Sequence, residues 1–540
     1  MARDFQLSSP SGFEGGQPRL TLGRIVPGIL FAVWLAVVGL QAVYHVVWRD
    51  EVRALSLALN GGSLIDMVGA VHGEGHPLLW YLLLRGTHEL FPVPQVLPGV
   101  ALAVAVIAAL LLAFVSPLPW PVIGLCLAGY AFLFEYSVEA RNYGITMMML
   151  FFLAAYYRRG GRNGIVIGLL LVLLANCNVH SDILAGAFLL FWGGDIYLDN
   201  GLRCFAQARQ WAVATGLTIL GMGLCAATVF PTFNDAVVPQ WHQELHVWSL
   251  AVALVDPAGQ SRFGELAGVR LAPNLLHGVG KVIIEGIGSV ILYGSTLGLV
   301  RRPAAFIAAL GSMLMLSLFF TFVYGGSYRH DALWLSFLVA LYWMVWEMPQ
   351  KGKAGEGQGF CVYLSRIGVV FFVVLLGIQA VRGVVNLALA VETGVPRSQS
   401  ANFATYVKDH VALRDAILIA DPDYLLEPMP YYLRNPTYLM RQQVYGNVVK
   451  FTTKARLDMS LGDVLAVAET LHKTTGRPVV ILLQHGIVAN QPEVAYAEGY
   501  DWTLSVTPRQ ASQFLQATIL LKHFAPASTN ESFDAYLLRS

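Results

Sequence analysis

Two adjacent carboxylates, Asp50 and Glu51, directly follow a long apolar run in the first part of the chain. A carboxylate at the end of a membrane helix can take a proton from a hydroxyl group or hold a metal ion. The alternative is a solvated helix start, because acidic side chains are favoured in the first helical turn. Asp50 and Glu51 are therefore candidate catalytic residues whose assignment depends on the groups near them.

A second polar cluster reads His-Gly-Glu-Gly-His-Pro and contains His72, Glu74 and His76. Two imidazoles and a carboxylate at this spacing can bind Zn²⁺ or another divalent cation, but the glycines disfavour a regular helical face and no fourth ligand is visible. We expect a substrate-lining loop in which Glu74 and His76 make hydrogen bonds. A bound divalent cation stays an open alternative, and the identity of any metal ligand is unknown.

Two arginines stand at ends of apolar runs, Arg141 between Glu139 and Tyr143, and Arg329 before His330. We expect Glu139 and Tyr143 to line the substrate together with the histidine cluster and His180. The planar guanidinium group suits phosphate recognition. Either arginine could instead anchor a helix end at the membrane surface or pair with a neighbouring carboxylate. Weaker candidates are His180, near the end of another apolar run, and the segment 241–246, which also fits an amphipathic surface helix.

The composition defines the elements that must position these residues. Of the 540 residues, 56% are hydrophobic and only 13% charged, with a net charge of +1 and a mean hydropathy of +0.57. A soluble domain carries about 25% charged residues, so an ordinary cytosolic protein is excluded, and nucleic acid is not an expected partner. The five cysteines show no spacing typical of a disulfide framework or a thiolate metal site.

Apolar runs of about 20 residues indicate an all-α polytopic membrane protein. We expect about 11 transmembrane helices, at 25–47, 95–115, 119–136, 142–157, 164–179, 183–198, 211–230, 282–300, 303–324, 331–347 and 367–389.

The apolar segment 76–91 is short for a span and carries Arg85, His88 and Glu89, which are costly at membrane depth. If it does not cross, the Lys and Arg clusters of the short loops all fall on one side, as expected for the cytoplasmic side. We therefore predict an interfacial helix within an outer loop, 48–94. The segment 1–24 is then cytoplasmic, and 48–94, 135–141, 231–281 and 327–331 face outward.

From about residue 391 charged residues become more frequent, which indicates a small soluble α/β domain over 391–540, outside the membrane. Short apolar runs predict buried strands at 416–420 and 479–483, and helical spacing predicts helices at 462–474 and 509–523. The segment 350–359 is a predicted cytoplasmic linker between the transmembrane domain, 25–390, and this domain.

The order of these pieces over residues 25 to 350 resembles the GT-C superfamily of integral-membrane glycosyltransferases. The resemblance is nearest to the protein O-mannosyltransferase and aminoarabinose (lipid A) transferase branch. It rests on an Asp-Glu pair after the first span, a loop ending in His-Pro-Leu-Leu-Trp-Tyr, a Glu-Ala-Arg-Asn-Tyr turn, His180 and a late arginine.

The resemblance implies transfer of a sugar, with inversion, from a polyprenyl-phosphate donor to an acceptor hydroxyl on the extracytoplasmic face. Asp50 matches the general base and Glu51 its neighbour, and His76 matches the end of the loop. Arg141 and Arg329, with His330, match the donor-phosphate site. The chain departs from many relatives at Leu78, where a second proline is common, and at His330, where a tyrosine is common.

The expected function is therefore that of a hexosyl- or pentosyltransferase of the cell envelope, in a bacterial inner (plasma) membrane. Its partners would be the lipid donor, the bilayer, and a glycan, lipid or protein acceptor. If the adjacent acids raise the pKa of Asp50, its function as a base near neutral pH is favoured. The alternatives are a transporter or flippase of a lipid-linked solute, and a non-enzymatic membrane receptor or assembly subunit.

Overall fold

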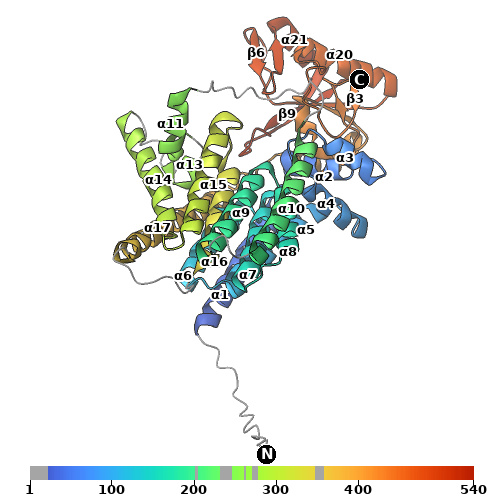
Figure 1. The fold of residues 1–540 in the computed structure, drawn as a ribbon. Helices are drawn as coiled ribbons and strands as arrows, with labels where there is room; N and C mark the ends of the chain where they lie inside the picture. Colours follow the sequence, from blue (N-terminus) through green and yellow to red (C-terminus); the bar gives the residue numbers. More distant parts are fainter. Residues whose placement is uncertain are drawn as a thin grey trace, which may run out of the picture.

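The computed structural model describes residues 22–200, 205–230, 246–260, 263–269, 278–346 and 358–539. The predicted cytoplasmic segment up to residue 21, the candidate segment 241–245 and most of the predicted linker, 350–357, lie outside these residues. A body of long helices forms the larger part of the molecule, and a strand-containing domain lies at one end of it (Figure 1).

Seven of the described helices are long and apolar enough to cross a membrane, so the chain is an integral membrane protein. Each coincides with a predicted span. They are α1 (Leu22–Tyr44), α5 (Val96–Leu110) with its π-helical continuation η1 (Leu111–Val115), α9 (Val179–Asn200), α10 (Phe205–Val229), α14 (Val279–Leu297), α15 (Pro303–Phe322) and α17 (Gln358–Thr393).

The other four predicted spans are also helical, but they fall outside these length and hydropathy limits. They are α6 (Trp120–Ala128) with the π-helix η2 (Ala131–Glu135), α7 (Tyr143–Arg158), α8 (Gly164–Ala175) and α16 (Tyr328–Val345). The run 119–136 is interrupted because Gly129 takes an extended conformation, with φ −64° and ψ 145°. α16 is buried along almost its whole length, which indicates that other helices surround it.

Three short helices, α2 (Arg49–Ala58), α3 (Leu64–Val71) and α4 (Leu79–Leu90), follow α1. The 12 residues of α4 rise about 18 Å, less than the ~30 Å of a bilayer core. The interfacial position of segment 76–91 stays a prediction. Three more short helices, α11 (Val247–Val255), α12 (Pro257–Gln260) and α13 (Phe263–Leu266), lie between α10 and α14.

The strand-containing part has a four-stranded sheet in the order β1-β5-β9-β8. The predicted strands are its parallel pair, β1 (Ile417–Asp421) and β5 (Val479–Leu483), and all ten of their residues are buried. β5 pairs antiparallel with β9 (Phe533–Leu538), which pairs with β8 (Thr518–Phe524). A second sheet has the order β4-β7-β6 (Asp458–Ser460, Thr503–Val506, Val494–Ala497), and β2 (Tyr438–Leu439) pairs with β3 (Val444–Tyr445).

The predicted helix 462–474 is α20 (Leu461–Thr475), but the predicted helix 509–523 is only half correct. α21 (Pro508–Ala517) ends at Ala517, and the next residues form β8. The β-branched Thr518 and Ile519 begin this strand, and pairing with β9 outweighs the helical spacing of the apolar residues.

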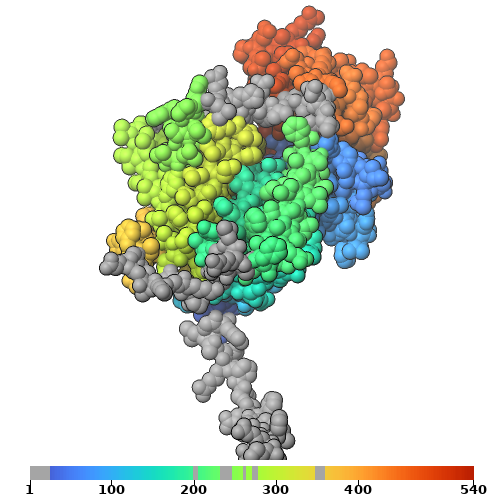
Figure 2. Space-filling view, viewed as in Figure 1, coloured from blue at the N-terminus to red at the C-terminus, as the bar shows by residue number. Residues whose placement is uncertain are grey.

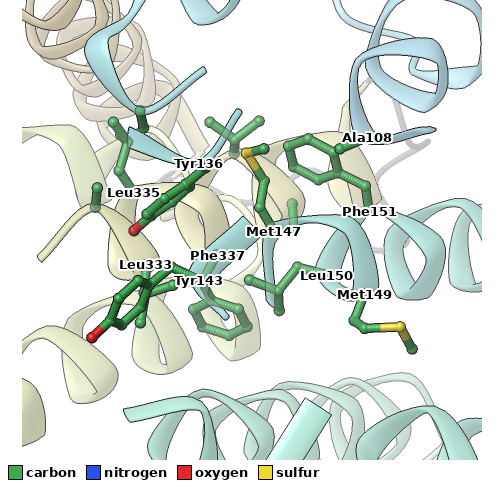
Figure 3. Close-up of a cluster of buried hydrophobic side chains, with 14 of the residues drawn as sticks. Ala108, Tyr136, Tyr143, Met147, Met149, Leu150, Phe151, Leu333, Leu335 and Phe337 are labelled. Carbon is green, nitrogen blue, oxygen red and sulfur yellow. The ribbon is translucent and has the colours of Figure 1, made fainter. Parts of the chain in front are cut away.

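The domain formed by α18 (Ser400–Asp409) and the elements after it covers the end of the helical body that also carries α2 to α4 (Figure 2). Inside the body, α7 packs against α16 and α5 through buried side chains such as Met147, Phe151 and Phe337 (Figure 3). Tyr136 and Tyr143 lie at the edge of this apolar cluster, with their hydroxyl groups directed away from Met147 and Phe151 (Figure 3). The apolar core of the helical body therefore ends at Tyr136 and Tyr143, beside the loop that precedes α7.

Candidate active site

Asp50 lies at the start of α2 between three arginines that come from different parts of the chain. Its Oδ2 accepts a hydrogen bond from Arg141, and Arg329 Nη2 lies 3.8 Å from the same oxygen. Arg49 Nε lies 3.6 Å from Oδ1. The loop before α7 and the start of α16 therefore meet the end of the first span, as the predicted placement of these polar pieces on one side requires.

The surrounding charges control the ionisation of Asp50. Burial by itself disfavours the carboxylate, but the positive charges of Arg141, Arg329 and Arg49 outweigh it and hold the pKa of Asp50 well below its ordinary value. The condition under which the adjacent acid would help Asp50 to act as a base, a raised pKa of Asp50, is not met, because three cations face Asp50 and Glu51 is directed elsewhere.

Glu51 is fully buried. Its Oε1 accepts from the backbone N–H of Ala140 at 2.6 Å, and its Oε2 accepts from the N–H of Trp48 at 3.1 Å and from His45 Nε2 at 2.9 Å. Glu51 therefore ties the start of α2 to the loop that carries Arg141.

An aromatic ring supports both phosphate-binding candidates. The ring of Tyr143 lies 5.5 Å from the guanidinium carbon of Arg141 and 6.0 Å from that of Arg329. Its hydroxyl bonds His330 Nε2 at 2.9 Å. His330 Nδ1 accepts from the backbone N–H of Ser327 at 2.8 Å. Both nitrogens of His330 are thus engaged, and this residue positions Tyr143.

Two more predicted residues, His76 and His180, join the same group. The ring of His180 lies 4.6 Å from that of His330. Burial, followed by the charges of Arg141 and Arg329, lowers the pKa of His76 to about 3, so this imidazole is neutral at physiological pH.

Some buried donors around Asp50 have unused hydrogen-bonding capacity. In the described part of the chain, Nε of Arg329 and both ring nitrogens of His180 are buried and have no hydrogen-bond partner. These atoms are therefore available for hydrogen bonds with water or with a polar ligand.

Three predicted site residues lie outside this group. Glu74 pairs with Arg53 at 2.6 Å, Glu139 pairs with Arg397, and His72 forms the carboxyl-terminal cap of α3. Burial and the nearby Glu135 raise the pKa of Glu139 above its ordinary value. Among the described residues no group of three or more His, Cys, Asp or Glu side chains is arranged to hold a metal ion.

The carboxyl-terminal domain contributes Glu427, Glu531 and Tyr424 to this region, and the sequence did not indicate the two glutamates. Arg53 pairs with the buried Glu427, and the backbone N–H of Arg49 donates to Glu531 at 3.1 Å. The guanidinium carbon of Arg49 lies 4.2 Å from the ring centre of Tyr424. The partners of Arg49 and Arg53 lie more than 370 residues away in the sequence, so no local pattern could identify them. The one local signal is the spacing of the two arginines, four residues apart on the same face of one helix.

A cavity of about 1520 Å³ between α2, α3 and the β2–β3 hairpin is a separate space. Its lining includes Val52, Leu55 and Leu59 of α2. At about 100° per residue these side chains lie roughly half a turn from Asp50. The cavity therefore opens on the opposite face of α2, and the arginine cluster does not line it.

No family model and no curated protein matches the chain. Among solved structures it is similar to ArnT from Cupriavidus metallidurans in the apo state, with 12% identity and a TM-score of 0.45 over 94% of this chain and 97% of that chain. The crystal structure of the same protein bound to undecaprenyl phosphate gives 12% identity and a TM-score of 0.34 over the same shares.

Proposed function

We propose that the chain is a GT-C-type membrane glycosyltransferase, which transfers a sugar from a polyprenyl-phosphate donor to an acceptor hydroxyl. The observation that carries the proposal is the position of Asp50, between Arg141 and Arg329 on one side and Arg49 on the other. A base beside a cluster of cations is what displacement of a phosphate by a hydroxyl group requires.

In the proposed reaction the acceptor oxygen attacks the anomeric carbon while Asp50 takes its proton. The bond between that carbon and the phosphate oxygen breaks, and the electron pair leaves with the polyprenyl phosphate. Arg141 and Arg329 stabilise the charge on this leaving group. Attack opposite the leaving group inverts the configuration at the anomeric carbon.

The low pKa of Asp50 makes the carboxylate a weak base as long as it pairs with the arginines. A donor phosphate at Arg141 and Arg329 would take over the hydrogen bond of Arg141 and the ion pair of Arg329 with Asp50, and would add negative charge beside Asp50. Both effects raise the pKa of a carboxylate. In this proposal donor binding therefore prepares Asp50 to accept a proton.

The remaining residues have supporting roles in the proposal. Glu51 and His330 position the groups that react, through Ala140 and Tyr143. The neutral His76 and the unpaired ring nitrogens of His180 are suited to hydrogen bonds with sugar hydroxyls. A polyprenyl tail stays in lipid while its phosphate lies at the interface, which matches arginines at helix ends. We propose that this end faces the extracytoplasmic side of a bacterial inner membrane.

The test uses the purified protein in lipid nanodiscs with radiolabelled undecaprenyl-phosphate sugars. We expect the sugar to be released to water or to an added acceptor, and Asp50→Asn to lose this activity while still folding. Arg329→Ala should weaken binding of undecaprenyl phosphate, whereas the control Arg477→Ala, at an exposed pair with Asp415, should not.

The same assay separates the alternatives. Movement of the labelled lipid across proteoliposomes without bond cleavage would overturn the proposal in favour of a flippase. Neither chemistry nor movement would favour a receptor or assembly subunit.

A further inference from the structure

A strained turn of the carboxyl-terminal domain lies beside the proposed site. Three successive residues between β6 and β7 have positive φ angles: Gly499 at 81°, Tyr500 at 54° and Asp501 at 58°. This conformation is uncommon for residues with a side chain and costs each of them stability. Strained backbone concentrates at functional sites, so the side chain that this turn presents is of interest.

The turn is nevertheless well defined by its own hydrogen bonds. The backbone N–H of Glu498 donates to the carbonyl of Trp502 at 2.9 Å, and the N–H of Trp502 donates to the carbonyl of Gly499 at 3.1 Å. Trp502 is almost fully buried, whereas Tyr500 is 38% exposed. The strain therefore holds an aromatic ring outside the domain core.

Tyr500 is held by a neighbour on one face. Its ring stacks on Phe451 with centres 3.7 Å apart and planes 19° from parallel. Phe451 in turn lies 5.2 Å from the guanidinium carbon of Arg53, one helical turn after Arg49 on α2. The two positive φ angles are those of a tight turn between antiparallel strands, and this turn fixes the direction of the Tyr500 ring.

Aromatic contacts connect Tyr500 to the proposed site. Its ring centre lies 6.5 Å from that of Trp502, the ring of Trp502 stacks on that of Tyr424 at 6.3 Å, and the ring of Tyr424 lies 4.2 Å from the guanidinium carbon of Arg49. Arg49 Nε in turn lies 3.6 Å from Asp50 Oδ1, whereas Arg141 and Arg329 approach Asp50 Oδ2. In agreement with this placement, burial and then the negative charge of Asp50 raise the pKa of Tyr500, while Arg49 and Arg53 act in the opposite direction.

We propose that the free face of Tyr500 forms one wall of the donor-sugar subsite and packs against the ring of the saccharide carried by the lipid phosphate. This inference rests on the proposed function and extends it. With the phosphate at Arg141 and Arg329, the attached sugar lies next to Asp50 and extends toward the carboxyl-terminal domain. The C–H groups on one face of a sugar ring are apolar and pack well on an aromatic ring.

The experiment compares the affinity of nanodisc-embedded protein for bare undecaprenyl phosphate with its affinity for undecaprenyl phosphates that carry a hexose, an aminohexose or a pentose. Tyr500→Asn removes the ring but suits the turn, because Asn tolerates positive φ. Tyr500→Phe keeps the ring. Tyr445→Ala is the matched control, since Tyr445 is an exposed tyrosine of the same domain that contacts Tyr438.

We expect wild type, Tyr500→Phe and Tyr445→Ala to prefer a sugar-bearing lipid over the bare lipid. Tyr500→Asn should lose roughly 2- to 10-fold of that preference, the range for one aromatic contact, with unchanged affinity for the bare lipid. An unchanged preference in Tyr500→Asn, or an equal loss in Tyr500→Phe, would overturn the stacking role.

The failures of the two proposals are distinguishable. A wild-type protein that binds the bare lipid but shows no preference for any sugar overturns the Tyr500 wall and leaves the phosphate site standing. A wild-type protein that binds none of the lipids overturns the proposed function and this subsite together.

Discussion

Asp50 and a donor phosphate would compete for the same two arginines, and this competition can be measured. We expect Asp50→Asn to bind undecaprenyl phosphate more tightly than the wild-type protein, although it does not transfer sugar. The substitution preserves the shape of the side chain but removes the negative charge that Arg141 and Arg329 share.

The size of the effect follows from the separations in the site. Arg329 Nη2 lies 3.8 Å from Asp50 Oδ2, so a phosphate bound to the same guanidinium group would lie about 5 Å from that oxygen. At an effective dielectric constant of about 20 two unit charges at this distance repel by about 3 kcal/mol. The Asp50 side chain is 27% exposed, and solvent and salt reduce the repulsion to about 1 kcal/mol, a gain in affinity of roughly fivefold.

The assay is binding of undecaprenyl phosphate to the protein in nanodiscs at two salt concentrations, followed by intrinsic fluorescence. The difference between Asp50→Asn and wild type should shrink at high salt, because the effect is electrostatic. A variant that binds the lipid more weakly than wild type would refute the reasoning, since it would mean that Asp50 assists binding of the phosphate instead of competing with it.

Glu427→Gln should lower the free energy of unfolding of the carboxyl-terminal domain by about 1–3 kcal/mol, because it removes one of two carboxylates that pair with Arg53. Urea denaturation measures this change. The control Asp415→Asn, at a side chain 90% exposed, should change the free energy of unfolding by less than about 0.5 kcal/mol. The depressed pKa of His76 means that its contribution to stability is full above pH ~6.5 and is lost as the pH falls toward 3. His76→Gln should therefore flatten the loss of stability between pH 6.5 and about 4, and an unchanged slope would contradict the neutral state of this residue. Tyr143→Phe leaves His330 Nε2 without its hydroxyl partner, so we expect about 1–3 kcal/mol of destabilisation and slower transfer, seen in thermal melts and the radiolabel assay; a wild-type rate would argue against the supporting role of Tyr143.

The transmembrane helices were the most predictable part of the structure, because runs of apolar residues must cross a bilayer as helices. All eleven predicted spans coincide with helices, and the two fully buried strands β1 and β5 were also correct. The break at Gly129 and the change from α21 to β8 at Ala517 were missed, since both depend on neighbours that the local pattern does not contain.

The candidate site was predictable where the chain places polar residues at helix ends. Asp50, Arg141 and Arg329 were identified in this way, and they do come together. The roles of the neighbouring residues could not be predicted, because these roles depend on hydrogen bonds. Glu51 and His330 look like site residues in the sequence, but their polar atoms make hydrogen bonds with other protein groups. Partners from the carboxyl-terminal domain, such as Glu427, had no sequence signal.

The contacts of Arg49 and Arg53 with Glu531 and Glu427 also set an order of assembly during biosynthesis. The ribosome makes α2 well before its partners, so the surroundings of Asp50 are incomplete while the helices of the nascent chain insert. We expect a chain stopped at residue 390 to insert its helices but to release no sugar in the radiolabel assay; activity of such a chain would show that the membrane part is sufficient. Because the surroundings of Asp50 need a domain that is made after the helices, an unfinished chain would not consume a lipid carrier that the cell needs.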